Sequence, residues 1–240
     1  MDRIFEATSM SGYGHPLRVS VFIGVVEYVD GDVIAESNAL PESISSSASA
    51  DSSGRCCCKC GWYLCKALTI PEHYLDVSYE KLFSGQLPTR IVIGLVSNRA
   101  FNGHLTANPF NFRHFDLSEI ALYLDGQQQH AVRPIQPNYE LGQYIRGYNS
   151  LFAGTGKLCK DEGLYIDRED YANGYALYAF DLTADLGEDD HFSLLRQGSV
   201  RLALKFAVAL PATATVVAYA EFENVIEVDR DRNVIFDFGV

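Results

Sequence analysis

The stretch that decides the fold is Val200-Arg201-Leu202-Ala203-Leu204-Lys205-Phe206. Its large apolar residues fall on every second position, and the cations Arg201 and Lys205 fall between them. A period of two with charges on one side is typical of a strand in an antiparallel sheet that buries one face. We therefore predict a strand here, with Leu202, Leu204 and Phe206 in the core.

Short apolar runs of the same kind recur from Lys66 onward, separated by Gly, Pro, Asn and Asp residues that favour turns. The 14 Phe and 14 Tyr residues also suit sheets. A jelly roll is built from about eight antiparallel strands. We predict an all-β fold, an antiparallel jelly-roll sandwich, with strands at residues 66–70, 90–96, 120–124, 127–132, 175–182, 200–207, 215–223, 225–229 and 233–238.

Two segments inside this region have helical spacing and predict short helical insertions. Residues 139–152 place Leu141, Tyr144, Tyr148 and Leu151 on one helical face, and Gly154 is the expected stop. Gly142 and Gly147 each weaken such a helix by about 1 kcal/mol relative to Ala, so packing must hold it. A second helix is predicted at 168–173, with Asp167 as its N-cap and Asp170 completing a capping box.

Residues 1–65 have a different character, and we predict an irregular N-terminal region that precedes a jelly-roll domain at 66–240. Residues 18–29 and 32–35 suggest a hairpin, because Asp30-Gly31 favours a two-residue turn. The Ser/Ala run at 45–53 has the composition of a flexible linker. A cysteine cluster ends the region.

Net charge, the length of apolar runs and the cysteine spacing argue against nucleic-acid binding, a membrane span and secretion. The 240 residues carry a net charge of −12, and an acidic surface repels phosphate backbones, so we expect no direct nucleic-acid binding over a broad face. No apolar run reaches the roughly 20 residues that cross a bilayer, and no signal peptide is recognisable. Five of the six Cys crowd into 56–65, unlike the disulfide framework of a secreted protein. We expect an intracellular location.

The cysteine cluster leaves two interpretations open. Cys57, Cys60 and Cys65 have spacing that loosely suits zinc, which needs four ligands, with one pair usually on a separate turn. The sequence nearby supplies only His73. The other interpretation, which we favour, is a thiol-rich segment without a metal; Cys159 stands alone.

The run Gly154-Thr155-Gly156-Lys157 resembles the end of a phosphate-binding loop. That motif requires Gly at position 151 and Ser or Thr at position 158, and both positions hold Leu. We predict instead a glycine-rich turn that follows a helix.

Other residues with catalytic chemistry form no recognisable set. His104 and His114 flank a predicted loop without the paired spacing of metal ligands, and we expect structural roles for both. The acidic stretches at 161–162, 167–170 and 188–190 do not follow the alternation of a calcium loop. We therefore nominate no catalytic, cofactor-binding or metal-binding residue and expect no enzyme activity.

Several blocks of sequence, in order, resemble the C-terminal part of double jelly-roll major capsid proteins of Polinton/Maverick elements and related eukaryotic double-stranded DNA viruses. The resemblance covers roughly residues 66–240. The blocks that carry it are 82–88, 101–103, 108–112, 122–126, 150–157, 170–175, 178–183 and 219–227.

The resemblance implies a structural protein without catalysis or cofactor. Its family builds icosahedral shells from chains with two jelly rolls, which form trimeric capsomers. Residues 1–65 do not resemble the first jelly roll. We therefore expect a capsid-like subunit of a virus or integrated element, or a truncated remnant of one. Its implied partners are its own copies, a full-length capsid paralogue and minor capsid proteins, in a virion or at an assembly site in the nucleus or cytoplasm.

Two alternatives share the predicted fold. A lectin-like binding module could stack Tyr139, Tyr144 and Tyr148 on a sugar, although helical spacing favours a core role for these residues. A cupin-like metal enzyme would need convergent His and Glu ligands on strands. If the capsid-like interpretation holds, Gly85, Gly126 and Gly174 are predicted at turns, and Pro88 at a strand entry.

Overall fold

The fold is that of a computed structural model. It describes the backbone of residues 27–29, 32–36, 49–50, 56–125, 127–128, 133–158, 165–183, 195–228 and 234–236. It describes the side chains of residues 62–125, 133–158, 165–183 and 195–223. Among these residues, no helix is long and apolar enough to span a membrane.

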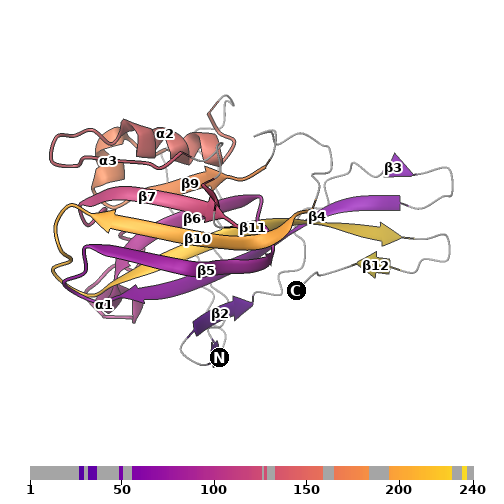
Figure 1. The fold of residues 1–240 in the computed structure, drawn as a ribbon, viewed down its shortest axis with the longest axis horizontal. Coiled ribbons are helices and arrows are strands. Elements are labelled where there is room, and N and C mark those ends of the chain that lie inside the picture. Colours follow the sequence, from indigo (N-terminus) through magenta and orange to yellow (C-terminus); the bar gives the residue numbers. More distant parts are fainter. Residues whose placement is uncertain are drawn as a thin grey trace, which may run out of the picture.

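Two antiparallel sheets stack face to face (Figure 1). Sheet A runs in the order β1-β2-β4-β11-β6-β9, with β3 beside β4 and β12 beside β11. Its strands are β1 Glu27–Val29, β2 Asp32–Glu36, β3 Ser49–Ala50, β4 Cys56–Ile70, β6 Arg90–Ser97, β9 Leu177–Asp181, β11 Ala214–Val228 and β12 Val234–Phe236. Sheet B runs in the order β5-β10-β7-β8, with strands β5 Asp76–Gln86, β7 Leu117–Leu124, β8 Gln127–Gln128 and β10 Gln197–Phe206.

The strand order identifies the sandwich as a jelly roll. Counting eight strands from β4 to β11, the first, eighth, third and sixth form one sheet, and the second, seventh, fourth and fifth form the other. Apart from β7 and β8, successive strands cross between the sheets, and the first and eighth strands of the count, β4 and β11, pair in the middle of sheet A, which is the double Greek key of a jelly roll. The predicted fold class is confirmed.

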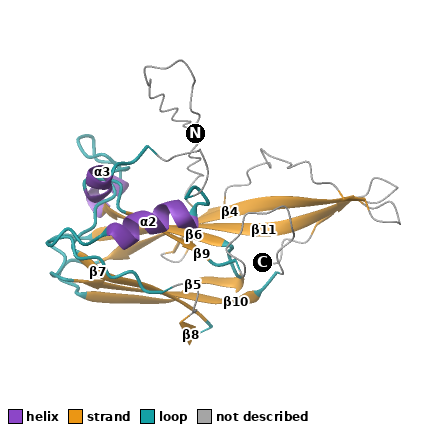
Figure 2. Ribbon diagram, turned by 90° about the horizontal axis from the view of Figure 1, so that it is seen from above, coloured by secondary structure: helices purple, strands orange, loops and turns teal. Residues whose placement is uncertain are grey.

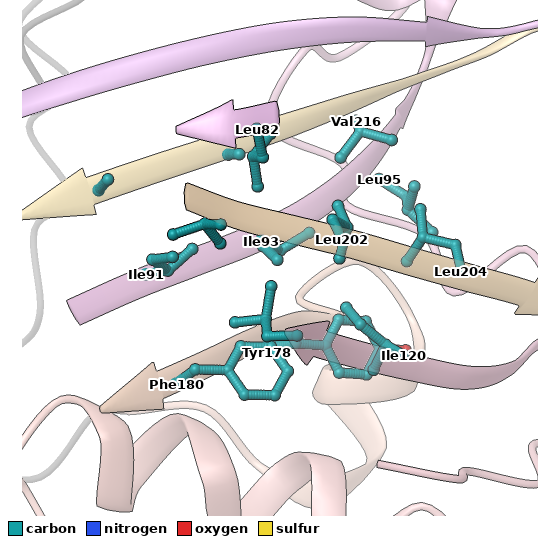
Figure 3. Packing of buried hydrophobic residues seen from close by; sticks show 14 of the residues in the cluster. Leu82, Ile91, Ile93, Leu95, Ile120, Tyr178, Phe180, Leu202, Leu204 and Val216 are labelled. Carbon is teal, nitrogen blue, oxygen red and sulfur yellow. The ribbon is translucent and has the colours of Figure 1, made fainter. Parts of the chain in front are cut away.

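Alternating side chains from the two inner faces fill one core (Figure 3). Leu202 and Leu204 of β10 are at most 1% exposed, as are Ile91 and Ile93 of β6. On β10 these alternate with half-exposed or exposed residues, as the sequence pattern predicts. The predicted core positions are therefore correct, and Phe206 at the end of the strand is 5% exposed.

Strand β3 was not predicted, because it lies within the segment 45–53 that was expected to be a linker. Three longer strands also differ from their predictions. The first begins at Cys56 rather than Lys66, so the cysteine-rich segment pairs with β11 down to Cys56 opposite Val228. The strands predicted at 215–223 and 225–229 are one strand, β11. Strand β5 was not predicted, because a register shift opposite Val200 and Leu202 puts the adjacent Leu82 and Phe83 both in the core and breaks the alternation.

The described part of the N-terminal region contains a pair of short antiparallel strands. Strand β1 pairs with β2 across the predicted Asp30-Gly31 turn, with Val29 opposite Asp32. Strand β2 then adds to the edge of β4. Residues 18–26 and most of the predicted linker lie outside the described residues, and the division into regions 1–65 and 66–240 stays a prediction.

The helical insertion lies between β8 and β9 and covers part of the outer face of sheet A (Figure 2). It contains α2 Ile145–Gly154 and α3 Arg168–Ala172; a further short helix, α1 Asn98–Phe101, was not predicted. Helix α2 starts six residues later than position 139, and Leu141 is exposed. Asp167 is the N-cap residue of α3 but makes no side-chain capping bond.

The stop of α2 is Gly156 rather than Gly154. Gly156 has a φ of 67°, its N–H donates to Ala153 O, and the Lys157 N–H donates to Phe152 O. These two bonds form a Schellman motif, which needs a residue in the left-handed region. Gly154 has a different role: a Cβ there would lie 2.8 Å from the backbone of Ala179, so its absence lets α2 approach β9.

The predicted turn residues have mixed outcomes. Gly174 lies in the turn after α3 with a φ of 141°. Gly85 is wrong as a turn residue, because it lies inside β5, where its φ is 100° beside the bulged segment. Gly126 lies outside the described residues. Pro88 sits two residues before β6, as predicted.

We predict that Leu202→Ala, Leu204→Ala and Phe206→Ala each lower the free energy of unfolding by about 2–5 kcal/mol, because each leaves a cavity between the sheets. Urea unfolding followed by fluorescence measures this. Lys205→Ala on the outer side of the same strand is the control, with a loss below about 1 kcal/mol. Equal midpoints for core and control variants would contradict the assigned faces.

We also predict that Gly154→Ala destabilises the protein although Ala is the better helix former, because the new methyl group would meet the backbone of Ala179. The expected loss is about 1–3 kcal/mol in urea unfolding. Ala153→Gly, at the exposed neighbouring position, should cost only about 1 kcal/mol through helix propensity. A stabilising Gly154→Ala would show that the helix has room to move outward.

Candidate interaction surface

Four connections meet at one end of the sandwich, which we call the loop end. Residues 71–75 join β4 to β5, 98–116 join β6 to β7, 173–176 lead into β9, and 207–213 join β10 to β11. The strand registers place them together, because Ala214 pairs with both Ile70 and Ser97.

Exposed apolar side chains gather at the loop end. Leu105 is fully exposed, and the others are about half exposed: Tyr74, Leu75, Phe110, Tyr175 and Val208. Leu195, two residues before β10, is half exposed at the opposite end, and the helical insertion exposes Leu141, Ile145, Leu158 and Tyr165. Exposed apolar side chains that gather in one region commonly mark a surface for protein association.

Backbone hydrogen bonds hold the four connections against one another. His73 N–H donates to Leu210 O, and Leu210 N–H donates to Tyr74 O. Phe112 N–H donates to Gly174 O, and Ala176 N–H donates back to Phe112 O. The loop end is therefore an ordered surface rather than a set of independent loops.

A cluster of stacked aromatic rings connects the loop end to the helical insertion. His114 stacks on Tyr139 with centroids 4.0 Å apart, and Tyr139 stacks on Tyr144 at 5.3 Å. Tyr144 lies against Tyr171 at 6.1 Å, and the Arg168 guanidinium lies over Tyr144. We call these four rings the aromatic column. It ties the β6–β7 connection to α3.

The column also reaches the core through phenol hydroxyls. Tyr139 and Tyr178 share a hydrogen bond of 2.6 Å between their hydroxyl oxygens, and Tyr171 Oη donates to Leu177 O. Burial raises the pKa of Tyr139 to about 12 and raises the pKa of Tyr178 and of Tyr171 well above the ordinary value. These phenols therefore stay neutral to a higher pH than an exposed tyrosine does.

The remaining outer faces have different chemistry. The outer face of sheet B is charged, with Arg201 beside Glu80 at 3.2 Å and Lys205 beside Glu119 at 3.3 Å. On sheet A, the half next to α2 is covered, while Tyr63 and Tyr219 stack on each other and stay about 40% exposed.

The residues weighed as possible sites do not assemble into one. Gly154-Thr155-Gly156-Lys157 ends α2, so the predicted turn is correct; Thr155 Oγ1 donates to Leu151 O. Cys65 lies half-buried on β4 with a free thiol, and burial raises its pKa. Cys56 to Cys60 have only their backbone described, and Cys159 and the stretches 161–162 and 188–190 lie outside the described part. Within it, no three His, Cys, Asp or Glu residues cluster.

The two histidines contact neighbouring side chains instead. His104 lies beside Arg99 and accepts from the Thr106 N–H, and His114 belongs to the aromatic column. Sequence reasoning indicated core roles for Tyr139 and Tyr144 of the column but not for Tyr171. His114 could not be paired with Tyr139 from sequence, because 25 residues separate them along the chain.

Comparison with known protein sequences gives one relevant relative. No family model matches the chain. An uncharacterised protein of Caenorhabditis elegans, F54H12.2, is 29% identical over 168 residues, which is 68% of this chain and 39% of that protein. The chain thus spans about two fifths of the relative it matches.

Comparison with solved structures gives chains from virus and virophage proteins. A chain in the 3.5 Å structure of the Sputnik virophage has 9% identity and a TM-score of 0.43, covering 76% of this chain and 39% of that one. A chain of the PBCV-1 virus capsid has 12% identity and a TM-score of 0.37, covering 76% and 52%. The mavirus major capsid protein has 10% identity and a TM-score of 0.34, covering 75% and 42%.

We predict that the protein loses stability as the pH rises from 10 to 12. The unfolded chain ionises Tyr139 near pH 10, whereas the folded chain keeps its proton until about pH 12. Stability therefore falls with rising pH, by up to about 1.4 kcal/mol per pH unit for this one phenol. Urea unfolding across this range measures the slope. Tyr139→Phe should show a smaller slope, and an unchanged slope would mean that Tyr139 is not protected.

Proposed function

We propose that this chain is a capsid-like structural protein that associates with copies of itself, and that the loop end takes part in this association. The observation that carries the proposal is the gathering of exposed Leu105, Phe110 and their apolar neighbours on one ordered end of a jelly roll. Exposed apolar surface is costly in an isolated protein and is removed from water when copies meet.

The sequence resemblance to double jelly-roll capsid proteins supports the same role, because the jelly-roll order of β4 to β11 is the order that the resemblance implies. Fold alone does not choose a function. The capsid-like assignment therefore rests on the ordered blocks of sequence together with the apolar loop end. A virion or an assembly site, with a full-length capsid paralogue and minor capsid proteins as further partners, belongs to this proposal.

The lectin-like alternative is not favoured by the side chains that it required. Tyr139, Tyr144 and Tyr148 are half-buried and packed against one another or against Tyr171. Tyr148 also donates to Ile166 O. A sugar would have to displace these contacts before it could stack on the rings.

Light scattering on a sizing column tests the proposal. We expect the purified chain to form a defined oligomer and the double variant Leu105→Ser, Phe110→Ser to shift it toward monomer. Leu195→Ser is the matched control, because Leu195 is half exposed but lies at the opposite end, and it should leave the mass unchanged. A wild-type chain that is monomeric at every concentration would overturn the proposal. If the two variants changed the mass equally, the loop end would have no special part in the association.

A further inference from the structure

A strained turn forms the last part of the β6–β7 connection, directly before β7. Two consecutive residues other than Gly have left-handed backbone, Phe115 with a φ of 45° and Asp116 with a φ of 51°. L-residues rarely adopt this conformation, and two in sequence persist only where neighbouring contacts hold them. The contacts made by this turn therefore decide whether the β6–β7 connection keeps its place.

The ring of His114 supplies one of those contacts. The Asp116 N–H donates to His114 Nδ1 at 2.9 Å, and the Leu117 N–H donates to His114 O at 2.9 Å. A nitrogen that accepts a hydrogen bond carries no proton, so the neutral ring has its proton on Nε2. Stacking on Tyr139, with 11° between the ring planes, fixes the orientation in which Nδ1 faces the amide.

A proton on Nδ1 would remove this acceptor. The Asp116 N–H would then face an N–H group, and the ring could turn away only by breaking its stack on Tyr139. Two neighbours favour the proton: the face of Tyr139 and the Asp116 carboxylate, 3.3 Å from Nδ1. The Asp116 side chain is 54% exposed, however, so water screens its charge.

The other surroundings of the His114 ring disfavour its protonation. The ring is half-buried, and the Arg113 guanidinium, which lies over Phe115, adds positive charge nearby. Burial, with a smaller effect of Arg113, lowers the pKa of His114 below its ordinary value against the opposite effect of Asp116. The folded state thus binds fewer protons than the unfolded chain once the pH falls below about 6.5, and this part of the stability is lost on acidification.

We propose that His114 is an acid-sensitive latch that holds the β6–β7 connection against the aromatic column and releases it on protonation. Release loosens the turn at Phe115 and Asp116, through which the segment that carries Leu105 and Phe110 joins β7. The latch is a property of the single chain; its use to control association by pH rests on the proposed function.

Nuclear magnetic resonance of the purified chain tests the latch directly. We expect the His114 ring to titrate below the ordinary range and the Asp116 amide resonance to move with the same midpoint. The hydrogen-exchange protection of the Asp116 amide, corrected for intrinsic exchange, should fall by roughly tenfold per pH unit below that midpoint. An Asp116 amide that keeps its protection while the His114 ring is protonated would overturn the proposal.

Two variants separate the acceptor from the stack. His114→Phe keeps an aromatic ring for Tyr139 but has no acceptor. Its Asp116 amide should therefore show at neutral pH the low protection that the wild type shows in acid. His114→Asn offers an acceptor oxygen near the position of Nδ1 but does not titrate, so its protection should not change with pH. A pH response that persists in His114→Asn would show that another group titrates, and would contradict the latch. If His114→Phe does not fold, the wild-type measurements and the His114→Asn variant still test the proposal.

Light scattering at the same pH values distinguishes this inference from the proposed function. If exchange responds to pH and the mass does not, the latch stands and its link to association fails. If the wild-type chain is monomeric throughout, the proposed function fails while the exchange measurement still tests the latch.

Discussion

The structure depends on how the outer face of sheet A is covered. The inner faces of both sheets bury each other, and the outer face of sheet B carries charged residues that water can solvate. The outer face at β6 and β9 carries Val92, Leu177 and Ala179, which water cannot solvate favourably. Burying an aliphatic side chain contributes roughly 1.5–3 kcal/mol, so a chain with this face must place a further layer on it. The insertion between β8 and β9 supplies that layer.

That requirement explains features that look unfavourable one by one. Gly147 and Gly154 weaken α2 as a helix, yet a Cβ at either position would lie 2.8 Å from Tyr171 Oη or from Ala179. The glycines thus make α2 a weaker helix but allow it to pack closely on β9. The same close approach brings Tyr171 and Tyr144 beside Tyr139, and so builds the aromatic column that reaches His114 at the loop end.

The sequence predicted those parts of the fold in which one local signal dominates. Strand β10 alternates cleanly because one face is core and the other faces water, and β1 and β2 pair on either side of the Asp-Gly dipeptide. Prediction failed where the sequence of a strand lacks regular alternation. In β5 a bulge makes the neighbours Leu82 and Phe83 both core residues. In β4 a cysteine-rich segment that lacks strand-like alternation is nonetheless paired along β11.

The loop end was less predictable because its contacts join segments far apart in the chain. No local pattern places Phe112 beside Gly174, or His114 beside Tyr139; the strand order does, by bringing the β6–β7 connection next to the entry of β9. The exposed Leu105 and Phe110 lie on the same connection whose turn His114 holds. The exposed surface suited to association and the strained turn that positions it therefore both follow from one topology. A substitution in the turn should change the arrangement of the surface, and a substitution in the surface should change the turn.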